Sequence, residues 1–170
     1  ANIPFIIRFR VVLLRDTGAP LAPFNAWQII QGLETVGLRM KQHCANAEKV
    51  VTFLETQKKV KNVIFPTNHQ GEIKERAKKY LQGGNGALVG ADLGTAEAGA
   101  KFIDNLKMLY HVANIGDARS LAIHPATTTH SQLSEKELLA AGVTPGYVRL
   151  SIGIEHPDDI IADIKQALAA

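Results

Sequence analysis

Arg149 has the most informative setting of any charged residue in this chain. It lies in the segment 147–152, where apolar and polar residues alternate. A strand of this pattern buries its aliphatic residues on one face and turns Arg149 to the other face. A guanidinium beside a covered surface binds planar anions, and a carboxylate fits best because it accepts two parallel hydrogen bonds. The residues alone leave a salt bridge to Asp117 or Glu155 equally open.

Histidine and cysteine residues offer weaker signals for metal binding or nucleophilic catalysis. His124 and His130 are six residues apart, but no carboxylate or Cys/His cluster completes a metal site at the usual spacing. Cys44 follows His43 on a predicted helix, where adjacent side chains diverge by about 100 degrees and form no base and nucleophile pair. We therefore predict structural histidines, no metal ligands and no catalytic residue among these groups.

Two loops have compositions that deserve comparison with ligand-binding loops. Gly83-Gly84-Asn85-Gly86 has free backbone amides, but it lacks the following Lys-Ser/Thr and helix of a phosphate-binding loop. We predict a turn there. The segment 113–131 gathers small polar residues and turn formers around one short apolar run. Loops of this kind at strand ends often hold ligands.

The elements that must position these residues follow from hydrophobic periodicity. Apolar residues at steps of three and four predict a long helix, or two abutting helices, from Leu21 to about Glu55 with a break near Gly37. Strands are predicted at 61–65, 87–93, 109–112, 120–123 and 147–152. Helices are predicted at 72–80, at 95–106 with Thr95 as cap, after a capping box of Ser134 and Glu137, and at 158–169.

This order of elements predicts an α/β chain of the two-layer α+β type. We expect a sheet of about four strands, mostly antiparallel or mixed, with helices on one face. Residues 1–20 are expected to be an extended lead-in from an upstream domain, 21–58 a long linking helix and 59–170 the C-terminal α/β domain. The chain opens without Met or a signal segment, which suggests a trimmed or processed protein.

Composition excludes several classes of protein. With 170 residues, 46% of them hydrophobic and 21% charged, the chain is unlike disordered proteins, collagen or coiled coils. Its net charge of +3 is scattered, which argues against nucleic acid as a partner, and its apolar runs are too short to span a membrane. A single cysteine excludes an internal disulfide and fits a reducing compartment, so a cytoplasmic location is predicted.

Several motifs carry a family resemblance. Residues 113–156 contain Asn-Ile-Gly-Asp, Ser-Leu-x-x-His-Pro-Ala, Thr-Thr-His-Ser-Gln, Gly-Val-Thr-Pro and Val-Arg-Leu-Ser-Ile-Gly-Ile-Glu-His. Together they resemble the C-terminal part of O-acetylhomoserine sulfhydrylases, in the pyridoxal-phosphate (PLP) dependent Cys/Met metabolism family. The segments 23–26, 31–35 and 38–40, with His43, resemble the linking helix of the same family.

The resemblance implies the small C-terminal domain of PLP fold type I and a set of substrate-binding residues. It implies that Arg149 grips the substrate α-carboxylate. Asn114 falls where related lyases carry a carboxylate-contacting serine, Thr129 falls on a threonine of the same pocket, and Ser120 is a further candidate. The Asn-Ile-Gly-Asp motif resembles the acetylhomoserine branch more than the γ-lyase branch.

The resemblance also implies a missing part. None of the lysines lies in the Ser-x-Thr-Lys context of the family's Schiff-base lysine, and the glycine-rich phosphate segment, stacking tyrosine and pyridine-binding aspartate are absent. The chain is therefore expected to be an inactive fragment, with no catalytic or cofactor-binding residue, of a homotetrameric enzyme of methionine biosynthesis. That parent would use PLP to convert O-acetylhomoserine and sulfide or a thiol to homocysteine or methionine and acetate.

Other interpretations stay open at this stage. The chain is alternatively a non-catalytic isolated domain, or a relative of cystathionine γ-synthase or methionine γ-lyase. A metal or acyl-transfer enzyme built on the histidines is a more distant alternative.

Overall fold

The computed structural model describes residues 3–170, and their contacts form two compact units that meet between Gly37 and Leu38. The first unit begins with a continuous helical segment: α1 (Ile3–Arg8), the π-helical η1 (Phe9–Leu14) and α2 (Arg15–Thr17). This helical segment ends at Gly18, whose amide donates to the carbonyl of Leu14 at 3.1 Å. The expectation of an extended lead-in is therefore wrong for these residues. Since no strand pairs with this segment, helical hydrogen bonds satisfy its backbone internally.

The predicted long helix is two helices, α3 (Pro23–Glu34) and α4 (Val36–Glu55). The interruption lies at Thr35, two residues before the predicted break at Gly37. Pro23 occupies the first turn of α3, where its missing N–H costs no hydrogen bond. The apolar stripe is buried only in the second half of α4, at Ala47, Val50 and Leu54.

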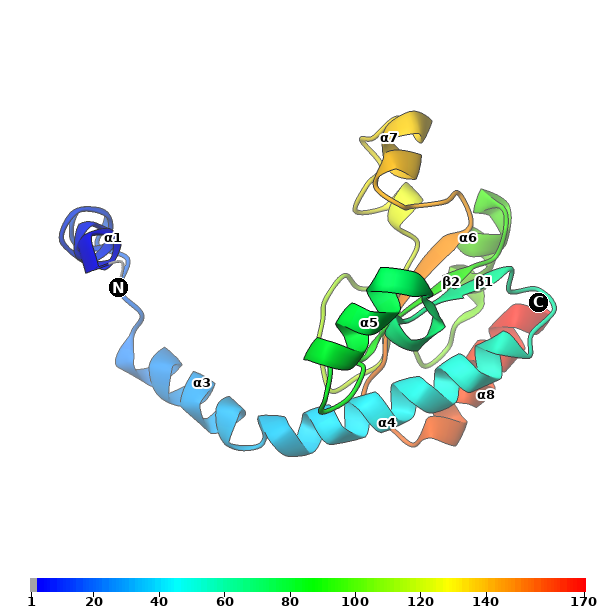
Figure 1. Ribbon diagram of the computed structural model, residues 1–170, viewed down its shortest axis with the longest axis horizontal. Helices are drawn as coiled ribbons and strands as arrows, with labels where there is room; N and C mark the ends of the chain where they lie inside the picture. The colour runs from blue at the N-terminus through cyan, green and yellow to red at the C-terminus, as the bar shows by residue number, and fades with distance from the viewer. Residues whose placement is uncertain (1–2) are drawn as a thin grey trace. The chain divides into compact units, whose positions relative to one another are not determined.

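A four-stranded antiparallel sheet forms the centre of the second unit (Figure 1). Its strands are β1 (Asn62–Ile64), β2 (Leu88–Asp92), β3 (Leu121–Ile123) and β4 (Tyr147–Ser151). They are arranged in the order β1-β2-β4-β3, and every neighbouring pair is antiparallel. The predicted sheet is confirmed in strand number and direction.

Four further helices complete this unit: α5 (Gly71–Tyr80), α6 (Ala96–Asn105), α7 (Glu135–Ala140) and α8 (Pro157–Ala169). Short 3-10 turns, η2 (Pro66–Asn68) and η3 (Pro125–Thr127), follow β1 and β3. The predicted caps are confirmed. The Thr95 hydroxyl accepts from the amide of Ala98 at 3.1 Å, and Ser134 and Glu137 form a reciprocal capping box.

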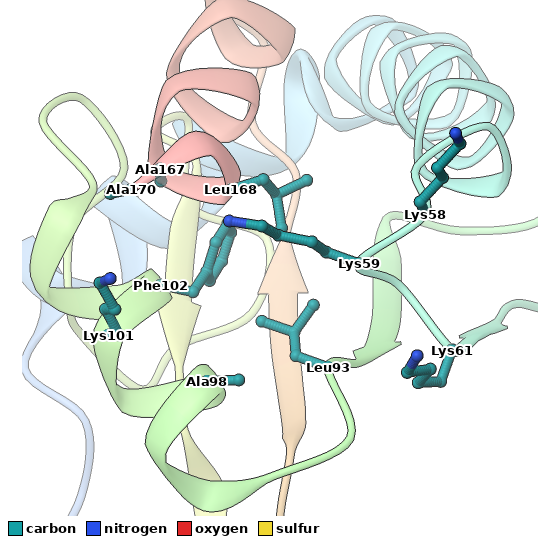
Figure 2. Close-up of a pocket in the computed structure, with 10 residues that line it drawn as sticks. All are labelled: Lys58, Lys59, Lys61, Leu93, Ala98, Lys101, Phe102, Ala167, Leu168 and Ala170. Carbon is teal, nitrogen blue, oxygen red and sulfur yellow. The ribbon is translucent and has the colours of Figure 1, made fainter.

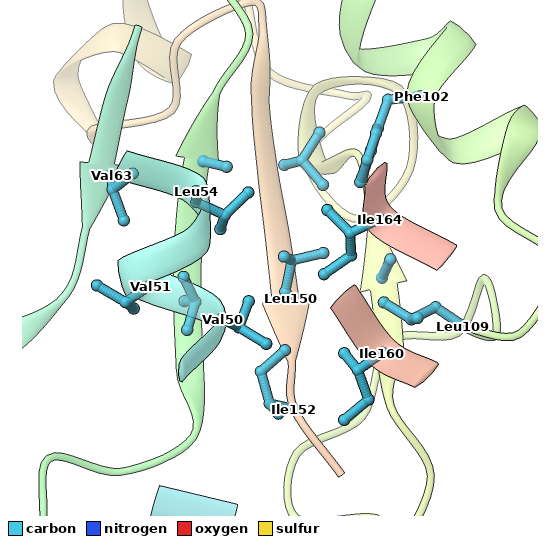
Figure 3. Close-up of a cluster of buried hydrophobic side chains, with 14 of the residues drawn as sticks. Val50, Val51, Leu54, Val63, Phe102, Leu109, Leu150, Ile152, Ile160 and Ile164 are labelled. Carbon is cyan, nitrogen blue, oxygen red and sulfur yellow. The ribbon is translucent and has the colours of Figure 1, made fainter. Parts of the chain in front are cut away.

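The hydrophobic core lies between one face of the sheet and the helices α4, α6 and α8. Figure 3 shows Val50 and Leu54 of α4 and Ile160 and Ile164 of α8 gathered over the β4 strand that carries Leu150. These side chains are 0 or 1% exposed. Complete burial of an aliphatic side chain stabilises a fold by about 1.5–3 kcal/mol. Helices cover this face as predicted, whereas α5 lies beside the opposite face, where its Ile73 and Arg76 share a cavity with Arg149.

The predicted strand at 109–112 is wrong. This segment makes only a single bridge, between Tyr110 and Leu121. On the N-terminal side of Tyr110, the carboxylate of Asp163 accepts from the amides of Lys107, Met108 and Leu109, at 2.8–3.2 Å. On its C-terminal side, the amide of Val112 donates back to the carbonyl of Tyr110 at 3.0 Å, which ends the pairing with β3. Backbone donors held by a side chain are not free to form a strand ladder.

Polar side chains of α4 hold the end of β4. The buried His43 ring places its Nδ1 2.6 Å from the carbonyl of Ile152. The Asn46 amide donates to the carbonyls of Gly153 at 3.0 Å and Glu155 at 2.8 Å. These bonds fix the position of the C-terminal end of β4 relative to α4, and β4 is the strand that carries Arg149.

None of the helices in residues 3–170 is long and apolar enough to cross a membrane.

Candidate functional site

Arg149 lies on the face of β4 that points away from the core. Its cross-strand neighbours are Gly90 on β2 and Ile123 on β3. A side chain at Gly90 would occupy the space of the Tyr147 ring, because a Cβ there would lie 2.6 Å from Tyr147 Cε2. The absence of a side chain at Gly90 thus leaves room for the Tyr147 ring.

An open cavity of about 460 Å³ borders this face of the sheet. Arg149, Tyr147 and Gly90 form its strand side, and α5 contributes Ile73 and Arg76. Arg76 is already paired with Glu72, with 2.6 Å between Nη2 and Oε1. Arg149 is therefore the arginine of this cavity that has charge to offer a ligand.

The Arg149 guanidinium is nearly unpartnered. Its Nη2 donates to the carbonyl of Asn114 at a long 3.4 Å, and its buried Nε has no partner in residues 3–170. The carboxylates of Asp117 and Glu155 are bonded elsewhere, to the amides of Arg119 and Ser120. Within the described chain no carboxylate forms an ion pair with Arg149. The salt-bridge alternative is therefore wrong.

Tyr147 stays neutral beside this cation. Burial raises the pKa of its phenol above the ordinary value, and the positive charge of Arg149 acts in the opposite direction. A neutral phenol supplies no counter-ion at neutral pH. An arginine that is half-buried and lacks a counter-ion is suited to an anionic ligand.

Two other candidate binding residues, Asn114 and Thr129, differ in whether they contact Arg149. Asn114 meets Arg149 through its backbone carbonyl, while its side-chain oxygen accepts from the amide of Ile115 at 2.9 Å. Thr129 is exposed, and its hydroxyl lies 2.8 Å from Nδ1 of His130. The structure shows no hydrogen bond between Thr129 and Arg149.

Ser120 is fully buried and its polar atoms are occupied. Its hydroxyl donates to Glu155 Oε2 at 2.9 Å and accepts from the amide of Gly153 at 2.8 Å. Its own amide donates to Glu155 Oε1 at 2.6 Å. The residue therefore ties the start of β3 to the segment after β4 and has no free hydroxyl for a ligand.

The predicted structural role of His124 is confirmed. The ring is buried, with Nδ1 2.9 Å from the Thr127 hydroxyl and Nε2 2.7 Å from the carbonyl of Pro145. His130, in contrast, lies on a partly exposed loop. Residues 3–170 contain no group of three or more His, Cys, Asp or Glu side chains able to hold a metal ion.

Replacing His124 with alanine is expected to lower the free energy of unfolding by about 3 kcal/mol. The change leaves a cavity and removes partners from two hydrogen bonds. Urea denaturation of the 170-residue chain measures the loss. The matched variant His130→Ala should lose less than about 0.5 kcal/mol, and equal losses in the two variants would refute the structural distinction.

Cys44 and the glycine-rich segment lie against each other. The predicted turn is confirmed at residues 82–83, and the following Gly84 packs so closely on the thiol that a Cβ there would lie 2.7 Å from Cys44 Sγ. Asn85 donates to Glu48 of α4 at 3.3 Å. This segment anchors the chain between α5 and β2 against α4, and none of its residues lines the Arg149 cavity.

Alternation along the strand placed Tyr147 on the same face as Arg149, but sequence patterns did not single out Gly90 or Arg76 as residues of this cavity. Gly90 faces Arg149 only because β2 pairs with β4 in one particular register. A local pattern assigns each residue to a face of its own strand, but carries no information on register between strands far apart in the chain. The glycine inside the apolar run of β2 was the available signal, since such glycines often mark a close approach.

The residues of this site do not fit the attachment of PLP. Lysine forms the Schiff base of PLP enzymes, but no lysine lines the cavity beside Arg149. Every lysine of the described chain is exposed except Lys74, which is half-buried on α5. The residues of this cavity therefore supply no attachment point for PLP.

A solved structure shares the whole fold. It is a protein described as an O-acetylhomoserine (thiol)-lyase from Campylobacter jejuni, 44% identical, with a TM-score of 0.92 over 99% of this chain and 40% of that chain. That crystal structure contains an N'-pyridoxyl-lysine-5'-monophosphate residue. The two-layer domain is thus that of a PLP-dependent enzyme of fold type I.

The family follows from the sequence comparisons. The model of the Cys/Met metabolism PLP-dependent enzymes matches residues 6–169. An O-acetyl-L-homoserine sulfhydrylase of Leptospira meyeri is 52% identical over 98% of this chain and 38% of its own length. A homocysteine/cysteine synthase of Saccharomyces cerevisiae is 42% identical over 98% of this chain and 40% of its own length. The chain belongs to the Cys/Met metabolism PLP-dependent enzyme family, and it spans about two fifths of the length of these relatives.

Proposed function

We propose that this chain is the substrate-binding C-terminal part of a PLP-dependent O-acetylhomoserine sulfhydrylase. The whole enzyme would exchange the acetate on Cγ of O-acetylhomoserine for sulfide or a thiol, which yields homocysteine or methionine and releases acetate. The observation that carries the proposal is the half-buried Arg149 guanidinium, with its buried Nε unpartnered. The names of the relatives favour this γ-replacement over a γ-lyase reaction.

Arg149 binds and orients the substrate in this proposal. Two parallel N–H donors match the two oxygens of an α-carboxylate, and this fork fixes the orientation of the amino acid as well as its position. The guanidinium keeps its proton throughout, since it cannot be deprotonated under physiological conditions. Its contribution is therefore placement of the bond to be broken, with no proton transfer.

The remaining candidate residues take supporting parts. Asn114 holds the guanidinium through its backbone carbonyl, at 3.4 Å from Nη2. Thr129 is exposed on the loop after η3 and is proposed to reach the substrate in the complete enzyme. Ser120 positions the loop that carries Asn114, through its bonds to Glu155 and Gly153.

Exposed apolar residues of the first unit support the proposal that a further part of the protein exists. Phe24 is 63% exposed and Trp27 is 54% exposed, on a helix with no buried residue. Contiguous apolar patches of this kind mark surfaces that pack against other protein. The remaining three fifths of the relatives' length would supply such a surface, together with the PLP-binding lysine. Homotetrameric assembly and a cytoplasmic location stay predictions.

Arg149→Ala in the full-length enzyme tests the proposal. The KM for O-acetylhomoserine is expected to rise on the order of 100-fold, because two charge-assisted hydrogen bonds are lost. Arg149→Lys should recover only part of this loss, since an ammonium group keeps the charge without the planar fork. Steady-state kinetics at saturating sulfide measures both variants.

The matched control is Arg76→Ala, which removes the paired arginine of the same cavity and should change KM less than about threefold. The 170-residue chain supplied with PLP serves as the blank and is expected to turn over no substrate. An unchanged KM in Arg149→Ala would overturn the carboxylate-binding role.

A further inference from the structure

A second cavity lies on the core side of the sheet and shares no lining residue with the Arg149 cavity. It has a volume of about 320 Å³ and an apolar floor made of Leu93, Phe102 and Leu168 (Figure 2). The walls come from α6, from the last turn of α8 and from the loop between α4 and β1. Cavities that bind small molecules have volumes from roughly 300 Å³ upward and mostly apolar walls.

Four lysines surround this apolar floor: Lys58, Lys59, Lys61 and Lys101. Figure 2 shows the Lys59 side chain extended across the cavity toward Phe102, and Lys101 on the far wall. Three of these lysines come from the loop after α4, and the fourth comes from α6. The fold therefore assembles the cluster from two separate elements.

The positive charge of the cluster is not neutralised by any side chain of the described residues, and its four lysines outnumber the one terminal carboxylate, that of Ala170, at the cavity. Among residues 3–170 no ion pair or side-chain hydrogen bond engages any of the four lysines, and no acidic residue lines the cavity. The C-terminal end of α8 offsets about half an elementary charge, and the carboxylate of Ala170 in the 170-residue chain offsets one more, so a net positive charge remains. Neighbouring like charges repel each other, and a bound anion would relieve that repulsion.

Isolated exposed lysines usually serve only to keep a surface hydrated. This cluster differs from such isolated lysines because it surrounds an apolar hollow lined by Phe102 and Leu168. Lysines that only keep a surface hydrated do not need such a hollow. An apolar hollow ringed by cations complements a molecule with an apolar body and one anionic end. At about 30 Å³ for each water-sized or methylene-sized group, the cavity holds about ten such groups.

We propose that this cavity binds an amphipathic anion, namely an aliphatic carboxylate of about eight to ten carbons. The chain of the ligand lies on Leu93, Phe102 and Leu168, and its carboxylate lies among the four lysines. The site is independent of Arg149 and of the proposed reaction.

Calorimetric titration of the 170-residue chain with butanoate, hexanoate and octanoate at low ionic strength tests this site. Each added methylene is expected to lower the Kd about threefold to fourfold. Octylammonium, which has the same chain and the opposite charge, is expected to show no binding. Octyl sulfate is expected to bind like octanoate, since the lysines recognise negative charge and no particular headgroup.

Variants separate the two halves of the site. The double variant Lys59→Gln and Lys101→Gln should raise the Kd for octanoate about tenfold, whereas Lys136→Gln, on the exposed α7, should leave it unchanged. Ala98→Leu fills the cavity from α6 with all four lysines retained, and should abolish octanoate binding. Equal binding of octylammonium, a Kd independent of chain length, or equal effects of the lysine variants would each overturn the proposal.

Discussion

Replacing Asp163 with alanine is expected to lower the free energy of unfolding by about 4 kcal/mol. The buried carboxylate accepts from three consecutive amides, of Lys107, Met108 and Leu109, at 2.8–3.2 Å. The Gln166 side chain donates a further bond at 2.9 Å. Removing the carboxylate leaves these donors without a partner, and each buried unpaired group costs about 1–3 kcal/mol. These amides have no neighbouring strand to bond instead, because the adjoining segment 109–112 forms only one bridge.

The same site gives a pH dependence with a defined sign. Burial acts to raise the pKa of Asp163, but the amides of Leu109, Lys107 and Met108, with Gln166, outweigh it and hold the pKa below its ordinary value. A group whose pKa is lower in the folded state stabilises the fold at pH values above its unfolded pKa, about 4. That contribution is lost as the pH falls through the folded pKa. The stability difference between the wild type and Asp163→Ala should therefore be full at pH 7 and shrink below pH 4.

Urea denaturation at pH 7 and at pH 3 measures both effects. Asp104→Ala is the matched control, because Asp104 is exposed on α6 and its side chain forms no hydrogen bond or ion pair within residues 3–170. It should change the free energy of unfolding by less than about 0.5 kcal/mol. A loss in Asp163→Ala that is as small as the control's, or that stays constant from pH 7 to pH 3, would contradict this account.

Gly153→Ala is expected to lower the free energy of unfolding by about 3 kcal/mol or more. A Cβ at this position would collide with the carbonyl oxygen of Ala118 and with Oε2 of Glu155, and would lie 2.5 Å from the carbonyl carbon of Arg119. Two of these atoms are backbone and cannot rotate away. Overpacking of this kind typically costs about 1–3 kcal/mol through forced backbone shifts, and hydrogen bonds are lost in addition.

The expected damage extends to the loop that carries Asn114. Gly153 donates to the Ser120 hydroxyl at 2.8 Å and accepts from Asn46 at 3.0 Å, so a shift of its backbone strains bonds to both β3 and α4. Thermal unfolding followed by circular dichroism measures the loss. Gly83→Ala, where an added Cβ meets no atom within 4 Å, is the control and should stay within about 0.5 kcal/mol. A wild-type melting temperature in Gly153→Ala would rule out the close packing described above.

Local patterns in the sequence were sufficient to predict most secondary structure. Alternation identified β4 and turned Arg149 away from the core, because side chains on a strand repeat every two residues. Thr95 and the Ser134–Glu137 pair marked helix starts, because their side chains satisfy amides within the same turn. Each of these features depends on residues a few positions apart, which a single sequence records directly. The family motifs around Arg149 added the expectation of a bound carboxylate.

Contacts between distant residues could not be predicted in the same way. The apolar stripe from Trp27 to Leu54 is continuous in the sequence, yet burial of its second half depends on where β4 and α8 lie. The segment 109–112 has the composition of a strand, but the carboxylate of Asp163, more than fifty residues away, takes the amide of Leu109, and the amide of Val112 turns back to Tyr110. The lysine-ringed cavity likewise exists only once α6 packs beside the loop after α4. Periodicity records which face of an element is apolar, whereas partner and register arise from packing between elements, which no local pattern specifies.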